Sequence, residues 1–241
     1  MLNGEPASGA SRSTTDFRDF DGTGGTIGVL WRDPAGISAG AVVHVPFQAH
    51  FDLAGQVTDA NGAESTRAQH LTMEVPVSYG FGISIRPSDR LTFAADFTRV
   101  EWGDFRLIDE RGNEFSAAGD PVGAGNEFLN PGDPVSPGVD ATNTIRLGVE
   151  YVIAAERPGF TTRAGAFYDP EPSRGAPASF WGGSVGLGFT TERFSVDLAY
   201  QLRVGLDVTR TATQRSVLQT RDRAGIDEFR HECLLSTVYY F

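Results

Sequence analysis

The stretch FSVDLAYQLRVGLDV, Phe194–Val208, alternates large apolar side chains with polar or small ones over its whole length. Successive side chains of a β-strand point to opposite faces, so this stretch predicts one long strand with two unlike faces. It is longer than the roughly five to six residues typical of strands in globular proteins. It is also long enough to cross a bilayer, for which about 9–11 tilted residues suffice.

The same period of two recurs along most of the chain and predicts about nine strands in all. No segment shows the 3.6-residue period of an amphipathic helix, so the expected fold is all-β. Within one run the apolar parity changes between Phe97 and Val100, which predicts a β-bulge near Arg99. The other runs are Thr23–Trp31, Ile37–Leu53, Leu71–Ile85, Leu91–Leu107, Thr144–Ile153, Thr161–Tyr168, Trp181–Phe189 and Phe229–Phe241.

The connections between these runs alternate between short and long. Outer-membrane barrels follow this rule, with short periplasmic turns and long extracellular loops. The sequence therefore predicts a transmembrane antiparallel β-barrel of outer-membrane type. Residues 1–22 are expected to be a loop remnant or disordered N-terminus, and residues 23–241 to hold the strands. The short connections are Arg32–Gly36, Arg86–Arg90, Ala154–Gly159 and Thr190–Arg193, and the long ones are Gly55–Ala68, Asp109–Ala141, Asp169–Phe180 and Thr209–Asp227.

Composition excludes several other classes of protein. The 241 residues carry a formal net charge of −11, and all 20 basic residues are arginine. A nucleic-acid binder needs clustered positive charge, so nucleic acid is not an expected partner. No apolar run reaches the roughly 18 residues of a spanning helix. The single Cys233 can form neither an internal disulfide nor a thiolate metal cluster.

The chain ends in the residues LSTVYYF, Leu235–Phe241. Leu235, Tyr239 and Phe241 share one face of the expected last strand. A terminal strand that ends in an aromatic residue is similar to the C-terminal signal that the barrel-assembly machinery reads in bacterial outer-membrane barrels. The alternative is an ordinary edge strand, because aromatic residues are enriched in strands generally.

Four stretches resemble the FadL/TodX family of outer-membrane transporters for long-chain fatty acids and other hydrophobic compounds. They are GGTIGVLWRDP (Gly24–Pro34) leading into Ile37–Val45, VPVSYGFGISIRPSDRLTFAADFTRVEW (Val75–Trp102), TIRLGVEY (Thr144–Tyr151) followed by RAGAFYDPEP (Arg163–Pro172), and Trp181–Tyr200. The order and spacing of these stretches carry the resemblance, which covers most of residues 22–241.

The resemblance implies a barrel that is incomplete in this chain. Members of the family have a signal peptide, an N-terminal hatch that plugs the lumen, and fourteen strands. The chain shows about nine of those fourteen strands, and the hatch and signal peptide are not found in it. We therefore expect the C-terminal part of such a protein, with Met1 either an internal methionine or an artefactual start.

The function implied by the resemblance is passive uptake of a hydrophobic small molecule across the bacterial outer membrane. The implied partners are outer-membrane lipid, lipopolysaccharide and the barrel-assembly machinery, and no cofactor is expected. A structural or adhesive barrel without transport is the main alternative, and a soluble all-β lipid carrier is a third. The ligand-binding residues are not predicted, although Arg146 or Arg163 could meet a carboxylate headgroup. The charged residues expected to face the lumen are Glu74, Arg86, Asp96, Arg146, Glu150, Arg163, Asp197, Arg203 and Asp207.

An outer-membrane phospholipase is a less favoured alternative, because it needs a serine and a histidine in contact on the outer wall. His231 has outward parity, but Ser236 lies several residues away along the same strand at about 3.3 Å per residue. His44, His50 and Asp52 share a face, yet the two histidines would be about 20 Å apart along a strand. The sequence therefore predicts neither catalytic residues nor a metal site.

Overall fold

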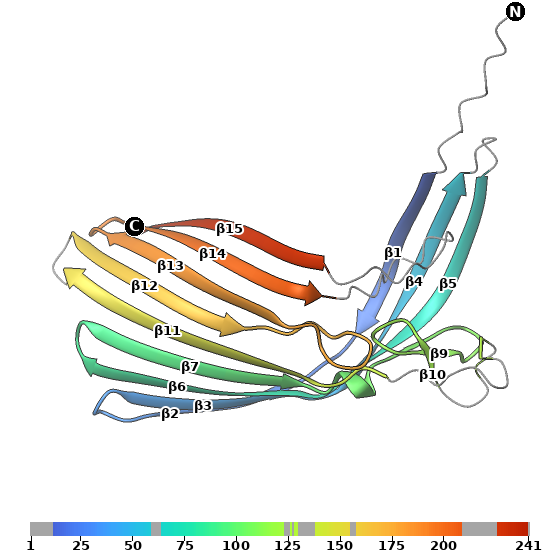
Figure 1. Ribbon diagram of the computed structural model, residues 1–241, viewed down its shortest axis with the longest axis horizontal. Helices are drawn as coiled ribbons and strands as arrows, with labels where there is room; N and C mark the ends of the chain where they lie inside the picture. Colours follow the sequence, from blue (N-terminus) through green and yellow to red (C-terminus); the bar gives the residue numbers. More distant parts are fainter. Residues whose placement is uncertain are drawn as a thin grey trace, which may run out of the picture.

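The computed structural model describes residues 12–58, 64–122, 126, 128–129, 138–154, 158–208 and 226–240. Its main element is a nine-stranded antiparallel sheet with the strand order β15-β14-β13-β12-β11-β7-β6-β3-β2, which we call the wall (Figure 1). The strands are β2 (Thr26–Arg32), β3 (Ile37–His44), β6 (Ser78–Ser88), β7 (Leu91–Val100), β11 (Thr142–Ala154), β12 (Gly159–Tyr168), β13 (Phe180–Thr190), β14 (Phe194–Val208) and β15 (Ile226–Tyr239).

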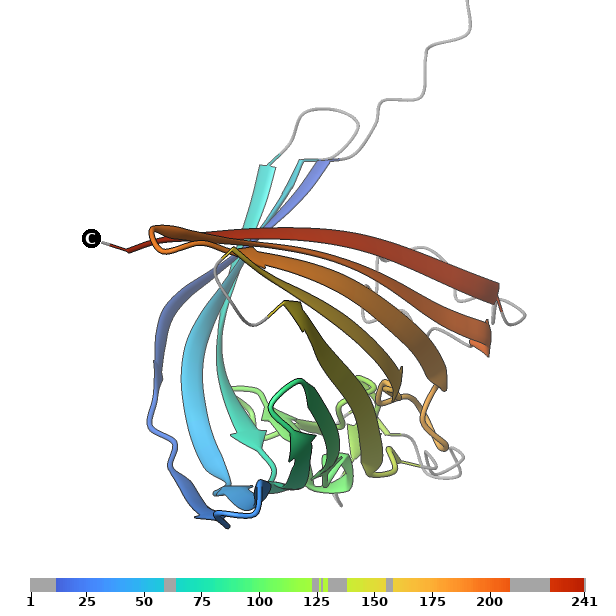
Figure 2. The same cartoon turned by 90° about the vertical axis from the view of Figure 1, so that its left-hand side faces the viewer.

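Seen end-on, the wall curls into an open trough with β2 and β15 at its two margins (Figure 2). These margins are not paired with each other among the described residues, so the barrel is not closed. The expectations of an all-β fold and of an incomplete outer-membrane-type barrel are confirmed. All eight strand pairings of the wall are antiparallel.

A second sheet continues three wall strands beyond the trough, and we call it the mouth sheet. In it β1 (Arg12–Gly22), β4 (Phe47–Thr58) and β5 (Glu64–Val75) pair in the order β1-β4-β5. These strands run directly into β2, out of β3 and into β6 respectively, and tilt away from the wall (Figure 1). Short strands β8 (Arg106–Ile108), β9 (Glu114–Phe115) and β10 (Pro121–Val122) extend the same sheet.

The break between the two sheets follows from glycine and proline. Gly24 and Gly25 separate β1 from β2, Pro46 separates β3 from β4, and Pro76 separates β5 from β6. Proline has no backbone N–H to donate to a ladder, so each of these points interrupts the sheet. The runs Ile37–Leu53 and Leu71–Ile85, expected as single strands, are therefore each divided in two.

Two further expectations are wrong. Arg12–Gly22 forms β1, whereas residues 1–22 were expected to be a loop remnant or disordered; residues 1–11 lie outside the described part. No bulge occurs near Arg99, which pairs in regular register with Tyr79 and Asn143. Val100, the last residue of β7, is an apolar side chain on the inner face in this regular register, and a 3₁₀ turn, Trp102–Asp104, follows the strand.

The outer face of the wall carries a band of exposed apolar side chains. On β13 the outward positions include Trp181, Val185 and Leu187, which are 64%, 59% and 61% exposed. From Trp181 to Phe189 this face spans about 26 Å at about 3.3 Å per residue. Outer-membrane barrels show an apolar band about 25 Å tall with aromatic residues at both borders. The outer face of the wall therefore has the height and the border residues of a lipid-facing surface.

The protein interior is small by comparison. The described apolar residues that are buried are Ala49, Phe51, Leu71, Val139 and Phe180. Three of these lie in the mouth sheet, where Phe51 contacts Phe17 and Phe20 at ring distances of 5.8 and 6.2 Å. Among the described residues, no helix is both long and apolar enough to span a membrane.

Candidate functional site on the inner face of the wall

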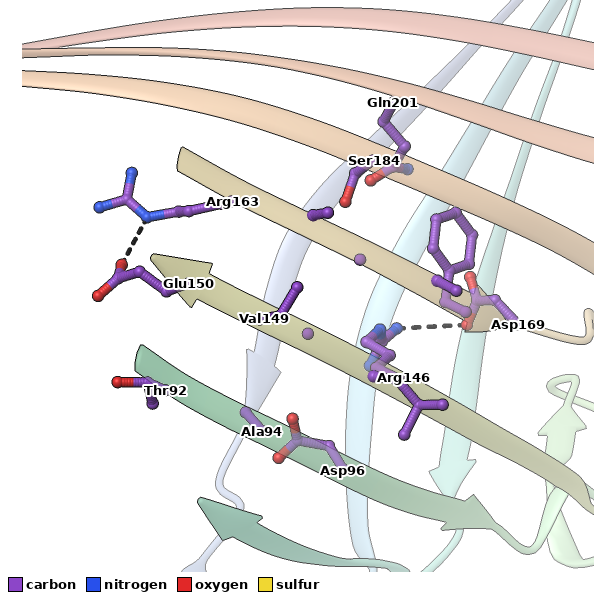
Figure 3. Close-up of a pocket in the computed structure, with 16 residues that line it drawn as sticks. Thr92, Ala94, Asp96, Arg146, Val149, Glu150, Arg163, Asp169, Ser184 and Gln201 are labelled. Carbon is purple, nitrogen blue, oxygen red and sulfur yellow. Dashed lines mark hydrogen bonds and ion pairs between the residues drawn. The ribbon is translucent and has the colours of Figure 1, made fainter. Parts of the chain in front are cut away.

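The inner face of the wall is polar where the outer face is apolar. A cavity of about 550 Å³ lies along β7, β11 and β12 and extends to β13 and β14. Figure 3 shows the side chains that line it, with Asp96, Arg146, Glu150 and Arg163 on three adjacent strands. The register places Asp96 opposite Arg146, and Glu150 opposite Arg163. Alternation thus gathers charged residues from separate parts of the chain on one surface.

Arg163 is the centre of an ion-pair chain across four strands. Its Nε donates a hydrogen bond of 2.7 Å to Oε2 of Glu150 on β11, and its Nη1 donates one of 2.5 Å to Oδ1 of Asp197 on β14. Strand β13 lies between Arg163 and Asp197, and it has Gly186 and Gly188 at the crossing. A Cβ atom at position 188 would lie 2.7 Å from Oδ1 of Asp197. Because Gly188 has no side chain, the ion pair between Arg163 and Asp197 can pass over β13.

Arg203 holds the β12–β13 loop, residues 169–179, against the inner face. Its Nη1 donates to Oε1 of Glu171 at 2.7 Å, and its Nη2 donates to the backbone carbonyl of Asp169 at 3.1 Å. The guanidinium lies 3.7 Å from the centre of the Phe180 ring, and Arg203 and Phe180 are only 7% and 1% exposed. The Phe180 ring in turn covers Gly205. This is the most buried charged contact of the inner face that the structure describes.

Further contacts attach the same loop to its surroundings. Nη2 of Arg146 donates to Oδ1 of Asp169 at 3.3 Å, and the Thr144 hydroxyl donates to the same oxygen at 3.1 Å. Arg174 forms an ion pair with Asp120, from the connection between β7 and β11, with Nε donating to Oδ2 at 2.8 Å. Two long connections thus meet at the end of the trough opposite the short turns.

A second cavity, of about 510 Å³, lies along β2, β3, β6 and β7. Most side chains on its inner surface are small, and we call this second cavity the glycine groove. Asp96 lines both cavities. A Cβ atom at position 82, opposite Asp96 in the register, would lie 2.7 Å from its Oδ1. The inward small residues of the groove are Gly28, Ser38, Gly40, Gly80, Gly82, Ser84 and Ala94.

Most of the expected lumen set comes together here: Asp96, Arg146, Glu150, Arg163, Asp197 and Arg203 share the inner face. Glu74 lies instead in the mouth sheet, where its Oε1 accepts a hydrogen bond from Gln48. Arg86 lies near the end of β6, and its Nη2 donates to the carbonyl of Asp89 in the β6–β7 turn. The side chain of Asp207 is outside the described part.

Sequence reasoning missed Asp169 and Glu171, because the segment YDPEPSRG has the composition of a solvated loop. Their position in the sequence could have indicated their role. Acidic residues that directly follow the end of a wall strand can fold back onto arginines of the inner face. Both Arg146 and Arg163, considered for a carboxylate headgroup, are already bonded to carboxylates of the chain.

The four histidines have separate partners. His44 contacts Thr26, His50 contacts Thr72, His70 contacts Asp52 at 2.8 Å, and His231 contacts the Tyr200 hydroxyl at 2.7 Å. Within the described residues, no group of three histidine, cysteine or acidic side chains could hold a metal ion. Ser236 and His231 face opposite sides of β15, since their register partners are Asp197 and Leu202.

The expected assembly-signal residues Leu235 and Tyr239 lie on the outer face of β15, opposite Leu198 and Phe194. Both are exposed. The third, Phe241, lies outside the described residues.

No protein-family model matches the chain, and no curated protein matches it. Among solved structures, the chain is similar to the CymD monoaromatic hydrocarbon channel, with 20% identity and a TM-score of 0.46 over 76% of this chain. It is also similar to the Pseudomonas putida toluene transporter TodX, with 15% identity and a TM-score of 0.44 over 89% of this chain. The chain spans 46% and 47% of the lengths of these two proteins. TodX is one of the two proteins after which the FadL/TodX family, which the sequence resembles, is named.

Proposed function

We propose that this chain forms part of the wall of a bacterial outer-membrane channel for the passive uptake of long-chain fatty acids or other hydrophobic compounds. The observation that carries the proposal is the two-faced wall. Its outer face has an apolar band of membrane height, whereas its inner face combines a charged cavity with the small-residue glycine groove. Such a wall separates lipid from a lumen that a hydrophobic molecule can enter.

The orientation that we propose follows from the connections. The short turns would face the periplasm, and the mouth sheet and long connections would lie outside the cell. Lipopolysaccharide and lipid would contact the outer band, and the barrel-assembly machinery would read the last strand. The free margins at β2 and β15 would pair with further strands, because unpaired backbone groups cost several kcal/mol each in lipid.

The test compares a strain that lacks the gene with one in which the gene is restored at its own locus. Uptake of radiolabelled toluene and oleate is measured in both, and the protein is located by membrane fractionation. We expect the protein in the outer-membrane fraction and faster uptake of at least one compound in the restored strain.

Two other outcomes would contradict the proposal. Outer-membrane location with unchanged uptake of both compounds would indicate a structural or adhesive barrel. Recovery of the protein in the soluble fraction would indicate a lipid carrier.

A further inference from the structure

The inner face has an unequal charge balance. Two arginines and three carboxylates line the larger cavity: Arg146, Arg163, Asp96, Glu150 and Asp169. Each arginine is already bonded to acidic side chains, Arg163 to two of them and Arg146 to one. An incoming carboxylate would have to displace a carboxylate of the chain to reach either guanidinium.

Asp96 is the carboxylate that remains. It has neither a hydrogen bond nor an ion pair with any residue that the structure describes, although it lies opposite Arg146 in the register. Arg146 turns instead toward Asp169 (Figure 3). No bonded cation among the described residues therefore offsets the Asp96 carboxylate on the cavity surface.

The position of Asp96 matters for any molecule that enters the two cavities. The residue lines both the charged cavity and the glycine groove, so it lies where the two meet. Its Oδ1 extends over Gly82, one of the small residues of the groove. A molecule in either cavity can therefore approach this carboxylate. Charged side chains that line a pore select against ions of the same sign.

We propose that Asp96 determines specificity by admitting uncharged hydrophobic molecules and opposing their carboxylate analogues. The inference rests on the proposed transport function and narrows its substrate class. Repulsion between two unit charges about 4 Å apart is about 1 kcal/mol even at the dielectric constant of water. That energy corresponds to about a fivefold difference in rate.

The test uses toluene and benzoate, which share a ring and differ in charge. Their uptake is measured at neutral pH in cells that carry the gene at its own locus, and the rates in a gene-deletion strain are subtracted. We expect gene-dependent uptake of toluene to exceed that of benzoate. Asp96→Asn should raise the benzoate-to-toluene ratio about fivefold.

Asp89→Asn is the matched control. It removes the same charge from the fully exposed β6–β7 turn, where Asp89 lines neither cavity, and it should leave the ratio unchanged. Ala94→Arg is the second variant, because residue 94 is on the inner face two positions from Asp96. An arginine there should raise the ratio without removing the carboxylate.

The outcomes separate the inference from the function on which it rests. Gene-dependent uptake of benzoate equal to that of toluene would overturn the inference and leave the channel function standing. An unchanged ratio in an Asp96→Asn or Ala94→Arg protein that reaches the outer membrane would do the same. If deletion of the gene alters the uptake of no hydrophobic compound, the channel function itself is wrong.

Discussion

At the scale of single residues, the missing side chain of Gly188 permits the ion-pair chain that is centred on Arg163. We expect Gly188→Val to separate Arg163 from Asp197, because its Cβ would lie 2.7 Å from the Asp197 carboxylate. Overpacking of this kind costs about 1–3 kcal/mol. The variant should show a lower midpoint of thermal unfolding in detergent.

Gly148→Val on β11 is the control for this change. A Cβ at position 148 would meet its nearest neighbour, the carbonyl oxygen of Ala164, at 4.0 Å, which is ordinary contact. Equal losses in the two variants would mean that Gly188 matters for the strand and not for the ion pair.

Asp109, outside the wall, caps the turn between β8 and β9. Burial alone would raise its pKa, but hydrogen bonds from the Asn113 side chain and from the backbone N–H groups of Asn113 and Arg111 outweigh burial, and its pKa lies below the ordinary value. A depressed pKa means that the charged form stabilises the fold. This contribution is present above the unfolded-state pKa and is lost as the pH falls through the folded-state pKa.

We therefore expect the turn at Asp109 to loosen only in acid below the usual aspartate range. Carboxyl chemical shifts followed by NMR should give a lower midpoint for Asp109 than the ordinary value of an aspartate in an unstructured peptide. A midpoint at or above that ordinary value would contradict the expectation.

The sequence predicts which face of the wall each side chain occupies, but it does not predict which side chains form ion pairs with each other. Alternation places Asp96 and Arg146 on the inner face, and their register makes them direct neighbours. Asp96 and Arg146 nevertheless form no ion pair, because Arg146 bonds to Asp169 instead. Asp169 lies in a loop whose sequence shows no periodic pattern. Partner choice of this kind depends on how a loop folds back in three dimensions, and a one-dimensional pattern does not record it.

At the scale of elements, β13 offers a test of the lipid-facing band. Val185 lies midway between Trp181 and Phe189 on the outer face, and Gln201 lies at nearly the same height on the inner face. We expect Val185→Arg to prevent outer-membrane assembly, since an arginine at the bilayer midplane costs about 2–4 kcal/mol. Gln201→Arg should assemble, as judged by a heat-modifiable band in the membrane fraction. The reverse order would mean that the two faces are exchanged.

The β12–β13 loop should be released when its buried anchor is removed. Arg203→Gln keeps a polar side chain but loses the ion pair with Glu171 and the contact with the Phe180 ring. We expect trypsin to cleave more rapidly after Arg174, which lies in this loop. Arg230→Gln, in an exposed pair with Glu232 on β15, should leave the cleavage rate unchanged. Equal cleavage of both variants would exclude Arg203 as the anchor.

The sequence pattern predicted that the wall strands exist, but it predicted less well the residues at which they begin and end. From Leu71 to Ile85 the odd positions stay apolar through the break at Pro76, so the period of two does not show that β5 and β6 belong to different sheets. Pro76 was the feature of the sequence that could have indicated the break between the two strands. Strand β1 was missed because its residues, Arg12–Gly22, are mostly polar and alternate weakly.

At the scale of the whole molecule, the assembly signal proposed for the last strand can be tested by substitution. Tyr239 is an exposed outer-face residue at the end of β15, and Tyr240 follows it directly. We expect Tyr239→Ala to lower the amount of protein in the outer membrane more than Tyr240→Ala does. Quantitative immunoblots of membrane fractions measure the difference. Equal amounts would indicate that the last strand is an ordinary edge strand.

The glycine and proline breaks between the wall and the mouth sheet have a consequence for variation among related proteins. Because the hydrogen-bond ladders are interrupted at Gly24, Pro46 and Pro76, a pair of residues gained or lost in β4 and β5 changes the height of the mouth sheet alone. The register of the wall, on which every inner-face contact depends, is unaffected. The mouth sheet can therefore change in length while the contacts of the inner face stay as they are.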